Sequence, residues 1–446
     1  MHGKGSGESR KSVKKVSIVS LGCPKNLVDS ERILGEVSEK YPVTFNPDEA
    51  QIVLINTCAF LEEARKEGEE VISEFIEKKK KGHIEKIIVL GCYPSLDTDV
   101  LKEKFPLVDG FVGTNNLKSV LKAIEYGGVY VDKRPEYADL PRLQVTLSHY
   151  SYLKIADGCN HRCAFCLIPK IKGDLHSFDI DFLIKEAKAL VENGVKEFVL
   201  IAQDTTQYGI DLYGRISLID LLKKIESIDD LHWIRILYTY PSPYIYELVR
   251  YIRDSAKVVP YIDMPIQHIS DRILRLMQRN STQKDIEEIV SCIKKNGLAF
   301  RTSVIVGFPS ETEEEFKMLK QFIVDYGVDH LGIFKYSDEK GTKSYSMPQL
   351  EENIKDERFS ELLDIKDTLA TKRSKSFLGA SLEFVVDYFD YEHNYFVGRT
   401  KFDAPDIDNI VITRNKVLPS QFYTGKVKRV KKYEWFMEVH NSCYFL

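Results

Sequence analysis

Three cysteines stand within eight residues in the stretch ADGCNHRCAFC, at positions 159, 163 and 166. Clustered cysteines in a cytosolic chain more often bind metal than form disulfides. A structural zinc ion takes four ligands, and ferredoxin-type clusters also use four cysteines. Cys159, Cys163 and Cys166 therefore leave one position open, which a distant cysteine, His161 or a substrate molecule could fill.

A second set of three cysteines is spread along the first part of the chain. Cys23, Cys58 and Cys92 each end a short apolar run, over residues 15–23, 51–58 and 85–92. Such runs are typical of strands buried on both faces, and the helical stretches between them predict an open parallel α/β sheet. Ligands bind beyond the carboxyl ends of parallel strands, so the three thiols could meet there. The alternative is that each is a small buried residue at a strand end.

The compact cysteine stretch needs a scaffold of its own. Six strand candidates follow residue 148, over residues 151–156, 197–204, 232–239, 258–265, 299–307 and 329–336. Helical stretches such as residues 179–194 and 310–327 lie between them. Six such units predict a partial (β/α)6 barrel, whose active site lies at the carboxyl ends of its strands. The cysteine stretch follows the first of these strands and therefore lies where chemistry is expected.

The last part of the chain predicts a third architecture. A charged helix is expected over Asn353–Leu378 with Gly379 as its cap, and short strands over residues 382–440 predict a small β-barrel. Its charge is divided: residues 380–408 hold seven acidic and two basic side chains, and residues 409–446 hold seven basic and two acidic ones. Such a module is often used for binding.

Composition limits the classes of protein to consider. The 446 residues are 43% hydrophobic and 29% charged, as in an ordinary folded protein of several domains. A net charge of −4 argues against a chain that coats nucleic acid by bulk charge. No apolar run approaches the ~20 residues of a membrane span, and residues 1–14 read as a disordered tail. We therefore expect a cytoplasmic protein without a membrane contact.

The spacing C-x-x-x-C-x-x-C on a loop after the first barrel strand, with the aromatic Phe165 before the last cysteine, resembles that of radical S-adenosylmethionine (SAM) enzymes. The resemblance implies a 4Fe–4S cluster held by three thiolates. Its open iron would bind the amino and carboxylate groups of SAM. One electron would cleave SAM to a 5′-deoxyadenosyl radical that abstracts a hydrogen, so no side-chain acid or base is implied as a catalyst.

The resemblance also implies contacts with SAM, by position in the barrel: Phe165, Gln203, Asp204, Arg235, Gln267, Arg301 and Gly307. The pair Gln203 and Asp204 ends the second strand, where such enzymes bind the SAM amino group, although a solvated loop is the alternative. A buried arginine needs a partner. For Arg235 and Arg301 this could be the SAM carboxylate or a structural ion pair.

The order of strand-end cysteines, radical SAM barrel and terminal barrel is similar to that of the methylthiotransferase family. The resemblance implies a disordered tail (1–14), an N-terminal methylthiotransferase domain (15–130), a linker (131–147), a radical SAM domain (148–378) and an OB-like TRAM domain (379–446). The cysteines at 23, 58 and 92 would then hold a second, auxiliary 4Fe–4S cluster. One SAM would methylate sulfur there, and a second would yield the radical.

Two branches of this family differ in substrate. LGCPKNLVDSE, INTCAFLEEAR, LIAQDTTQYGIDLYG and GRTKFDAPDID resemble the RimO branch, which modifies an aspartate β-carbon of small-subunit ribosomal protein S12. The other branch modifies position 2 of a tRNA adenosine. The acidic residues 380–408 favour a basic protein partner, because carboxylates repel phosphates. The basic GKVKRVKK could touch ribosomal RNA or be a solvated hairpin.

Further expectations concern partners. The reaction would need a sulfide source and an external one-electron reductant, for which a flavodoxin or ferredoxin is plausible. Without a coiled coil or an evident dimer face, we expect a monomer. A hypothesis from another class is a non-catalytic iron–sulfur or zinc protein that binds RNA through its terminal barrel, and it predicts no cleavage of SAM.

Overall fold

The computed structural model describes residues 14–132 and 140–440. Except for Lys14, the expected disordered tail lies outside these residues, as does part of the expected linker. The chain divides into two compact units. Unit 1 holds the residues up to Leu143 together with Lys170–Gly173, and unit 2 holds Gln144–Pro169 and Asp174–Leu446. In the described ranges, every helix is too short or too polar to span a bilayer.

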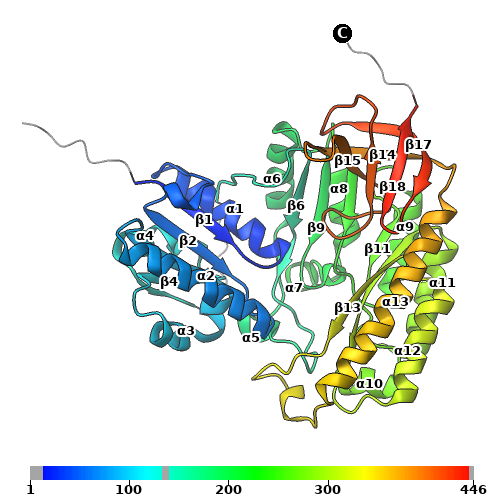
Figure 1. Cartoon of the computed structure of the whole chain (residues 1–446), viewed down its shortest axis with the longest axis horizontal. Coiled ribbons are helices and arrows are strands. Elements are labelled where there is room, and N and C mark those ends of the chain that lie inside the picture. The colour runs from blue at the N-terminus through cyan, green and yellow to red at the C-terminus, as the bar shows by residue number, and fades with distance from the viewer. Residues whose placement is uncertain (1–13, 133–139, 441–446) are drawn as a thin grey trace, which may run out of the picture. The chain divides into compact units, whose positions relative to one another are not determined.

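Unit 1 is built on five parallel strands in chain order, drawn in blue to cyan in Figure 1. They are β1 (Val16–Ser20), β2 (Ile52–Thr57), β3 (Lys86–Gly91), β4 (Gly110–Gly113) and β5 (Gly128–Tyr130). The first three confirm the strands that were expected to end in cysteines, and β4 and β5 extend the sheet. Every residue of β2 is buried, as expected of a central strand in a parallel sheet.

The helices of unit 1 connect these strands: α1 (Pro24–Ser38), α2 (Glu62–Lys80), α3 (Cys92–Lys104) and α4 (Val120–Tyr126), with the short turns η1 (Pro47–Glu49) and η2 (Leu117–Ser119). Pro24 fits the first position of α1, where a proline costs no helical hydrogen bond. One apolar cluster joins residues of the sheet to Ile33 and Val37 of α1 and to Ile124 of α4. This core fixes the strand ends from which the cysteines follow.

Unit 2 begins with the six strands that the sequence predicted: β6 (Tyr150–Lys154), β9 (Glu197–Ile201), β10 (Trp233–Ile236), β11 (Tyr261–Asp263), β12 (Ala299–Val306) and β13 (His330–Lys335). They form two parallel sheets, β6-β9-β10 and β11-β12-β13. A bridge between Ile234 and Val258 links them, as does a hydrogen bond from the Thr239 N–H to the Asp263 carbonyl at 2.9 Å. Pro260 precedes β11 and has no N–H to extend this pairing. The barrel is therefore partial and interrupted.

The helices of the barrel are α6 (Ile180–Glu192), α8 (Leu218–Glu226), α9 (Tyr244–Asp254), α10 (Asp271–Leu276), α11 (Gln283–Lys295), α12 (Glu313–Tyr326) and α13 (Glu352–Ser376). Shorter elements are β7 (Ala156–Asp157), α5 (Ile168–Ile171), β8 (His176–Ser177), η3 (Thr205–Gln207), α7 (Ile210–Tyr213) and η4 (Ser344–Ser346). Capping boxes begin α11 at Thr282 and α12 at Thr312, each with its acidic residue three positions on.

Five strands after α13 close into the small barrel that the sequence predicted, drawn in orange to red in Figure 1. They are β14 (Ser381–Asp390), β15 (Tyr395–Thr400), β16 (Ile410–Thr413), β17 (Phe422–Val430) and β18 (Glu434–Val439). Trp435 and Phe384 lie in its core. The indole of Trp435 donates to Ser374 of α13 at 2.9 Å, which ties this barrel to the preceding helix.

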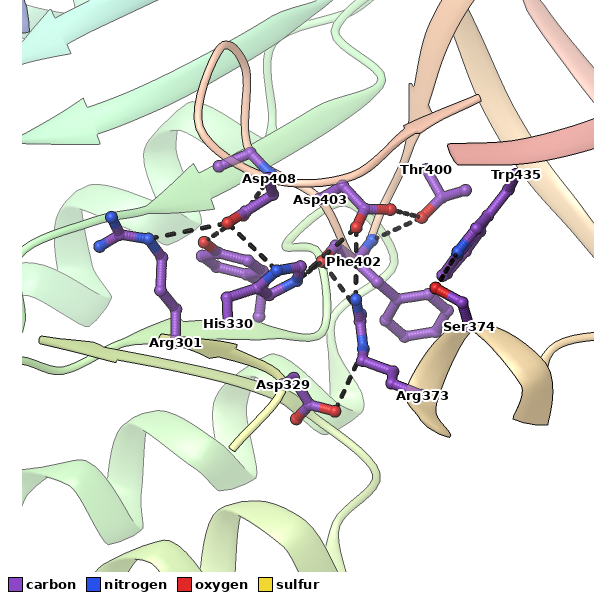
Figure 2. A network of polar contacts seen from close by, with 12 residues as sticks. Arg301, Asp329, His330, Arg373, Ser374, Thr400, Phe402, Asp403, Asp408 and Trp435 are labelled. Atoms are coloured by element: carbon purple, nitrogen blue, oxygen red, sulfur yellow. Dashed lines mark hydrogen bonds and ion pairs between the residues drawn. The ribbon is translucent and has the colours of Figure 1, made fainter. Parts of the chain in front are cut away.

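The loop between β15 and β16 reaches into the partial barrel of unit 2 (Figure 2). Asp408 lies 3.2 Å from His330 Nδ1 and accepts a hydrogen bond from Tyr261 at 2.6 Å. Asp403 lies 3.5 Å from Arg373 and accepts from Thr400. The side chains of both aspartates are almost fully buried. They contact the first residues of β11 and β13, which lie at the end of the strands opposite to the cysteine stretch.

A second group of buried charges lies beside this loop. Glu197, the first residue of β9, bonds to Arg235 Nε at 3.0 Å and forms an ion pair with Arg399 of β15. Arg399 also lies 3.2 Å from Asp387, whose carboxylate meets His149 at 2.7 Å. Because each charge has a partner of opposite sign or a hydrogen bond, burial of the group is tolerated.

These contacts correct the interpretation of the acidic residues 380–408. Six of the seven have partners inside unit 2: Glu383, Asp387, Asp390, Asp403, Asp406 and Asp408. The remaining one, Glu392, is exposed. Five of these side chains therefore help to hold the small barrel on the rest of unit 2 instead of facing a basic protein partner, whereas Asp390 pairs with His393 of its own hairpin. The sequence could not separate the two roles, because the number of carboxylates in a segment does not show which of them find partners inside the fold.

We expect Glu197→Gln to destabilise unit 2 by about 3–5 kcal/mol, because Arg235 and Arg399 would remain buried without their shared carboxylate. Urea unfolding followed by tryptophan fluorescence measures this, since the only two tryptophans are Trp233 and Trp435. Glu383→Gln is the matched control. Its partner His232 is 42% exposed, so the loss should stay below about 1 kcal/mol. Equal losses in the two variants would contradict the assignment.

Asp403 should make stability depend on pH. Burial raises the pKa of Asp403 to about 6, although attraction to Arg373 opposes this. Between about pH 4 and 6 the folded state then binds more protons than the unfolded state, so the contribution of Asp403 to stability falls as pH rises. Asp403→Asn removes this titration. The free energy of unfolding of the unsubstituted protein, relative to this variant, should decline across that window, and a constant difference would contradict the assignment.

Candidate functional site

The structure brings the three strand-end cysteines of unit 1 together. We call Cys23, Cys58 and Cys92 the unit 1 trio. The sulfurs of Cys23 and Cys92 lie 4.0 and 3.6 Å from the side-chain oxygen of Asn26. A Cβ atom on Gly22 would lie 2.8 Å from the Cβ of Cys58, so Cys58 faces the turn that leads to Cys23. The expectation that the thiols meet at one sheet edge is thus met by the fold.

Local backbone features make room at this edge. Gly22 and Gly91 have φ values of +102° and +94°, which other residues rarely adopt. The amide of Asn26 is fixed because it donates to the carbonyls of Leu21 and Thr57, each at 3.2 Å. Helices α1 and α3 begin beside the thiols of Cys23 and Cys92. Their positive ends favour the negative charge of thiolates and of a cluster.

A buried cation also belongs to unit 1. Lys172 is 3% exposed and lies 3.4 Å from Asp29, which is itself buried in α1. Burial raises the pKa of Cys58, and the charge of Lys172 opposes this more weakly. Because metal ligation requires the thiolate, Lys172 favours the form of Cys58 that can bind iron.

The second group, Cys159, Cys163 and Cys166, is the unit 2 trio. It lies on a loop whose ends are joined by a two-residue antiparallel ladder between β7 and β8. Inside the loop, the Cys166 N–H donates to the Cys163 carbonyl at 3.1 Å. The Ala164 N–H donates to the Met277 carbonyl at 2.9 Å, which fastens the loop to the segment after α10. The trio follows the first barrel strand, as expected.

The thiols of Cys159 and Cys166 are held in their neutral form while no metal is bound. Burial, the largest influence, raises the pKa of Cys159 to about 11 and that of Cys166 to about 12. The neighbouring Cys163 raises both further, because thiolates repel one another. Iron that binds here must therefore displace protons, and it supplies the positive charge that the site lacks.

Phe165 lies beside the trio but packs into an apolar cluster with Ile273, Met277, Phe308 and Tyr336. This contact anchors the cysteine loop. In the described residues, no three His, Cys, Asp or Glu side chains are placed to share a single metal ion. A cubane cluster takes each thiolate on a separate iron, so its ligands need not converge on one point.

Gln203 and Asp204 follow β9 close to the cysteine loop, with different partners. Gln203 donates to Asp157 at 2.8 Å, and its buried side-chain oxygen has no partner in the described part of the protein. A buried acceptor without a donor is costly, so this oxygen fits the amino group of SAM. Asp204 instead accepts from His161 at 2.7 Å and from the Thr206 N–H at 2.9 Å.

The arginines expected near SAM are already paired. Arg235 bonds to Glu197 and, at 3.0 Å, to the carbonyl of Lys401. Arg301 bonds to Asp263 at 2.7 Å and lies 3.7 Å from Asp408. The structure thus gives both side chains the structural ion pair that the sequence left open as the alternative to SAM. Their contacts hold the small barrel on the partial barrel, and they supply no free charge to the cysteine loop.

Gln267 and Gly307 lie in the loops that follow β11 and β12 and adopt positive φ values of +70° and +72°. The backbone of Gln267 bonds to Ser303 and Ile305 of β12. The Gly307 N–H donates to the buried carboxylate of Glu311. A Cβ atom on Gly307 would lie 2.4 Å from Lys355 Cγ, so only glycine fits there. Neither observation identifies a ligand.

Sequence reasoning missed several residues of the site. Asn26 lies between two thiols of the unit 1 trio, three positions after Cys23. Tyr240 stacks on His161 with ring centroids 3.9 Å apart, and Arg279 lies over the same tyrosine at 4.2 Å. His161 was considered only as a metal ligand. The spacing from a cysteine was the one available signal for Asn26, and nothing local marks Tyr240 or Arg279.

Three family profiles match the chain: Uncharacterized protein family UPF0004 over residues 15–113, the Radical SAM superfamily over residues 153–323 and the TRAM domain over residues 378–439. The first contains the unit 1 trio and the second contains the unit 2 trio. A radical SAM domain implies SAM and a 4Fe–4S cluster, and the donor set of three thiols on one loop is chemically suited to that cluster.

Several full-length relatives carry one description. Ribosomal protein uS12 methylthiotransferase RimO of Thermoanaerobacter sp. (strain X514) is 39% identical over 436 residues, covering 95% of this chain and 99% of that relative. The protein of the same name from Geotalea uraniireducens is 42% identical over 410 residues, covering 89% and 92%. Among solved structures, the radical SAM methyltransferase TsrM from Kitasatospora setae has a TM-score of 0.53 at 16% identity, covering 72% of this chain and 73% of that one. It shares the fold.

Proposed function

The chain belongs to the radical SAM methylthiotransferase family, and from this membership we propose that it inserts a methylthio group at the β-carbon of an aspartate in ribosomal protein uS12. The similarity over nearly the full length to relatives described as uS12 methylthiotransferases carries the proposal. Two separate thiol trios support it, because methylthiolation needs both a radical and an activated sulfur.

The two trios would hold two 4Fe–4S clusters, each with one open iron. When bound, the cluster at the unit 2 trio supplies the electron that cleaves SAM, and the cluster at the unit 1 trio supplies a site for sulfur and its methylation. The protein contributes position and charge. Asn26, the ends of α1 and α3, and Lys172 surround the unit 1 thiols with groups that suit an anion.

For SAM, we propose a smaller set of contacts than the sequence predicted. The unpaired oxygen of Gln203 receives the SAM amino group, and Gln267 and Gly307 line the strand ends nearby. Phe165 and Asp204 hold the cysteine loop in place. Arg235 and Arg301 stay with their carboxylates and take no part in SAM binding.

The substrate is tested by offering both candidates. Reconstituted protein receives SAM, sulfide and a one-electron reductant without oxygen, with small ribosomal subunits in one tube and unmodified tRNA in another. Mass spectrometry should find the methylthio group on an aspartate of protein uS12 and none on tRNA. A methylthio group on tRNA adenosine alone would preserve the chemistry and reject the substrate.

The remaining components are proposed on the same basis. A flavodoxin or ferredoxin would deliver single electrons, and sulfide would replace the sulfur that is consumed. The protein would act as a monomer in the cytoplasm, where its ribosomal substrate is found. The domain boundaries near residues 15, 130, 148 and 379 remain our proposal for how these steps divide along the chain.

A further inference from the structure

Arg279 differs from other buried arginines of unit 2. Arg235, Arg358 and Arg399 each pair with a carboxylate. Arg279 is 8% exposed, and within residues 14–132 and 140–440 no carboxylate forms an ion pair with it. Its Nη2 donates to the Pro265 carbonyl at 2.7 Å, and its buried Nε has no acceptor among the same residues. Burying a cation without a paired anion is costly, so we expect an anionic group to bind beside Arg279.

The position of Arg279 relative to the unit 2 trio follows from main-chain contacts. Helix α10 ends at Leu276, and Gln278 takes a φ of +57°, which turns the chain back. The Arg279 N–H then bonds to the Leu274 carbonyl at 2.8 Å. The carbonyl of Met277, two residues before Arg279, accepts from Ala164, which lies between Cys163 and Cys166.

A stack of side chains holds Arg279 in this place. Its guanidinium lies 4.2 Å from the centre of the Tyr240 ring, and this ring stacks on His161 at 3.9 Å with an angle of 13°. His161 is fixed by Asp204 at 2.7 Å, and Tyr240 accepts from the Asn280 N–H at 3.2 Å. The stack therefore ties the cysteine loop to the segments after β9, β10 and α10.

We propose that Arg279 is a positioning residue that holds a fixed positive charge beside the cluster of the unit 2 trio and thereby raises its reduction potential. This inference rests on the proposed function, because it assumes the cluster there. One electron from a flavodoxin- or ferredoxin-type donor adds one negative charge to the cluster. A nearby cation stabilises that reduced form more than the oxidised form, since hydrogen bonds and net charge set cluster potentials.

The test measures the midpoint potential of this cluster by redox titration with electron paramagnetic resonance, in the absence of SAM. The starting protein carries Cys58→Ala, so that the unit 2 cluster alone is observed. Arg279→Gln should lower the potential by about 59 mV or more, which means an about tenfold smaller reduced-to-oxidised ratio at a fixed donor potential. Arg279→Lys, which keeps the charge, should restore most of the shift.

Arg272→Gln is the matched control, because Arg272 lies on the preceding helix α10, is 43% exposed and pairs with Glu315. Its potential should not change. Tyr240→Leu is a second variant that keeps the charge but removes the ring beneath it, and a smaller shift in the same direction is expected. An unchanged potential in Arg279→Gln, or an equal shift in Arg272→Gln, would overturn the proposal.

A separate measurement of SAM binding distinguishes whether Arg279 serves the cluster of the unit 2 trio or the carboxylate of SAM. If Arg279→Gln leaves the potential unchanged but weakens SAM binding at least about tenfold, the charge serves the SAM carboxylate and the proposal fails. The potential is read without SAM and without any substrate. Its outcome is therefore independent of whether the methylthio group goes to a ribosomal protein or to tRNA.

Discussion

Cys163→Ala should abolish the formation of 5′-deoxyadenosine from SAM. Removing one of three thiolates leaves the cluster of the unit 2 trio without a ligand, and the loop between β7 and β8 offers no substitute, because His161 is held by Asp204 and Tyr240. We expect the rate of SAM cleavage to fall by more than the about 10- to 100-fold that typically follows the loss of a residue that only orients a metal ligand. Liquid chromatography of the nucleoside after an anaerobic reaction measures it.

The matched control for this variant is Cys292→Ala. Cys292 lies on α11, outside both trios, and is partly exposed. SAM cleavage should be unchanged in this variant. If Cys163→Ala retained the cleavage rate of the control, the assignment of radical formation to the unit 2 trio would be refuted.

Cys58→Ala should separate the two halves of the reaction. The unit 2 trio is intact in this variant, so SAM should still be cleaved to 5′-deoxyadenosine at a rate within about threefold of the unsubstituted protein, the usual scatter of a remote change. Insertion of the methylthio group should fall below detection, because the unit 1 trio would no longer hold a cluster. Both products are counted in the same reaction, by chromatography and by mass spectrometry of the substrate.

Two outcomes would contradict this division. Full insertion activity in Cys58→Ala would show that the sulfur does not come through the unit 1 trio. Loss of SAM cleavage would show that the trios do not serve separate steps. Measuring the iron content of the variant is the necessary control, since it shows whether the remaining cluster is present.

Much of the fold followed from local sequence patterns. Buried apolar runs ending in Cys23, Cys58 and Cys92 predicted a parallel sheet with thiols at one edge, and the structure has that sheet. The six barrel strands were predicted correctly for the same reason. The spacing of apolar residues predicts the alternation of strands and helices. Strands β4 and β5 gave a weaker signal, because they are short and rich in glycine.

The roles of charged residues could not be predicted in this way. Arg235 and Arg301 lie in apolar strands, and their partners Glu197 and Asp263 come from other strands. The loop that carries Asp403 and Asp408 is far along the chain, yet it fills the end of the partial barrel (Figure 2). Such pairs depend on tertiary contacts, and a single sequence does not report which carboxylate meets which arginine. Arg279 was overlooked because it stands out only by being buried without an ion pair, which the sequence does not show.

The central claim is that one chain holds two 4Fe–4S clusters on two separate thiol trios. Chemical iron analysis with Mössbauer spectroscopy of anaerobically reconstituted protein tests it most directly. We predict about eight irons per chain in the unsubstituted protein, and about four when all three cysteines of either trio are replaced by alanine, since each 4Fe–4S cluster contributes four. About four irons in the unsubstituted protein, or the same iron content in both triple variants and the parent, would contradict the claim.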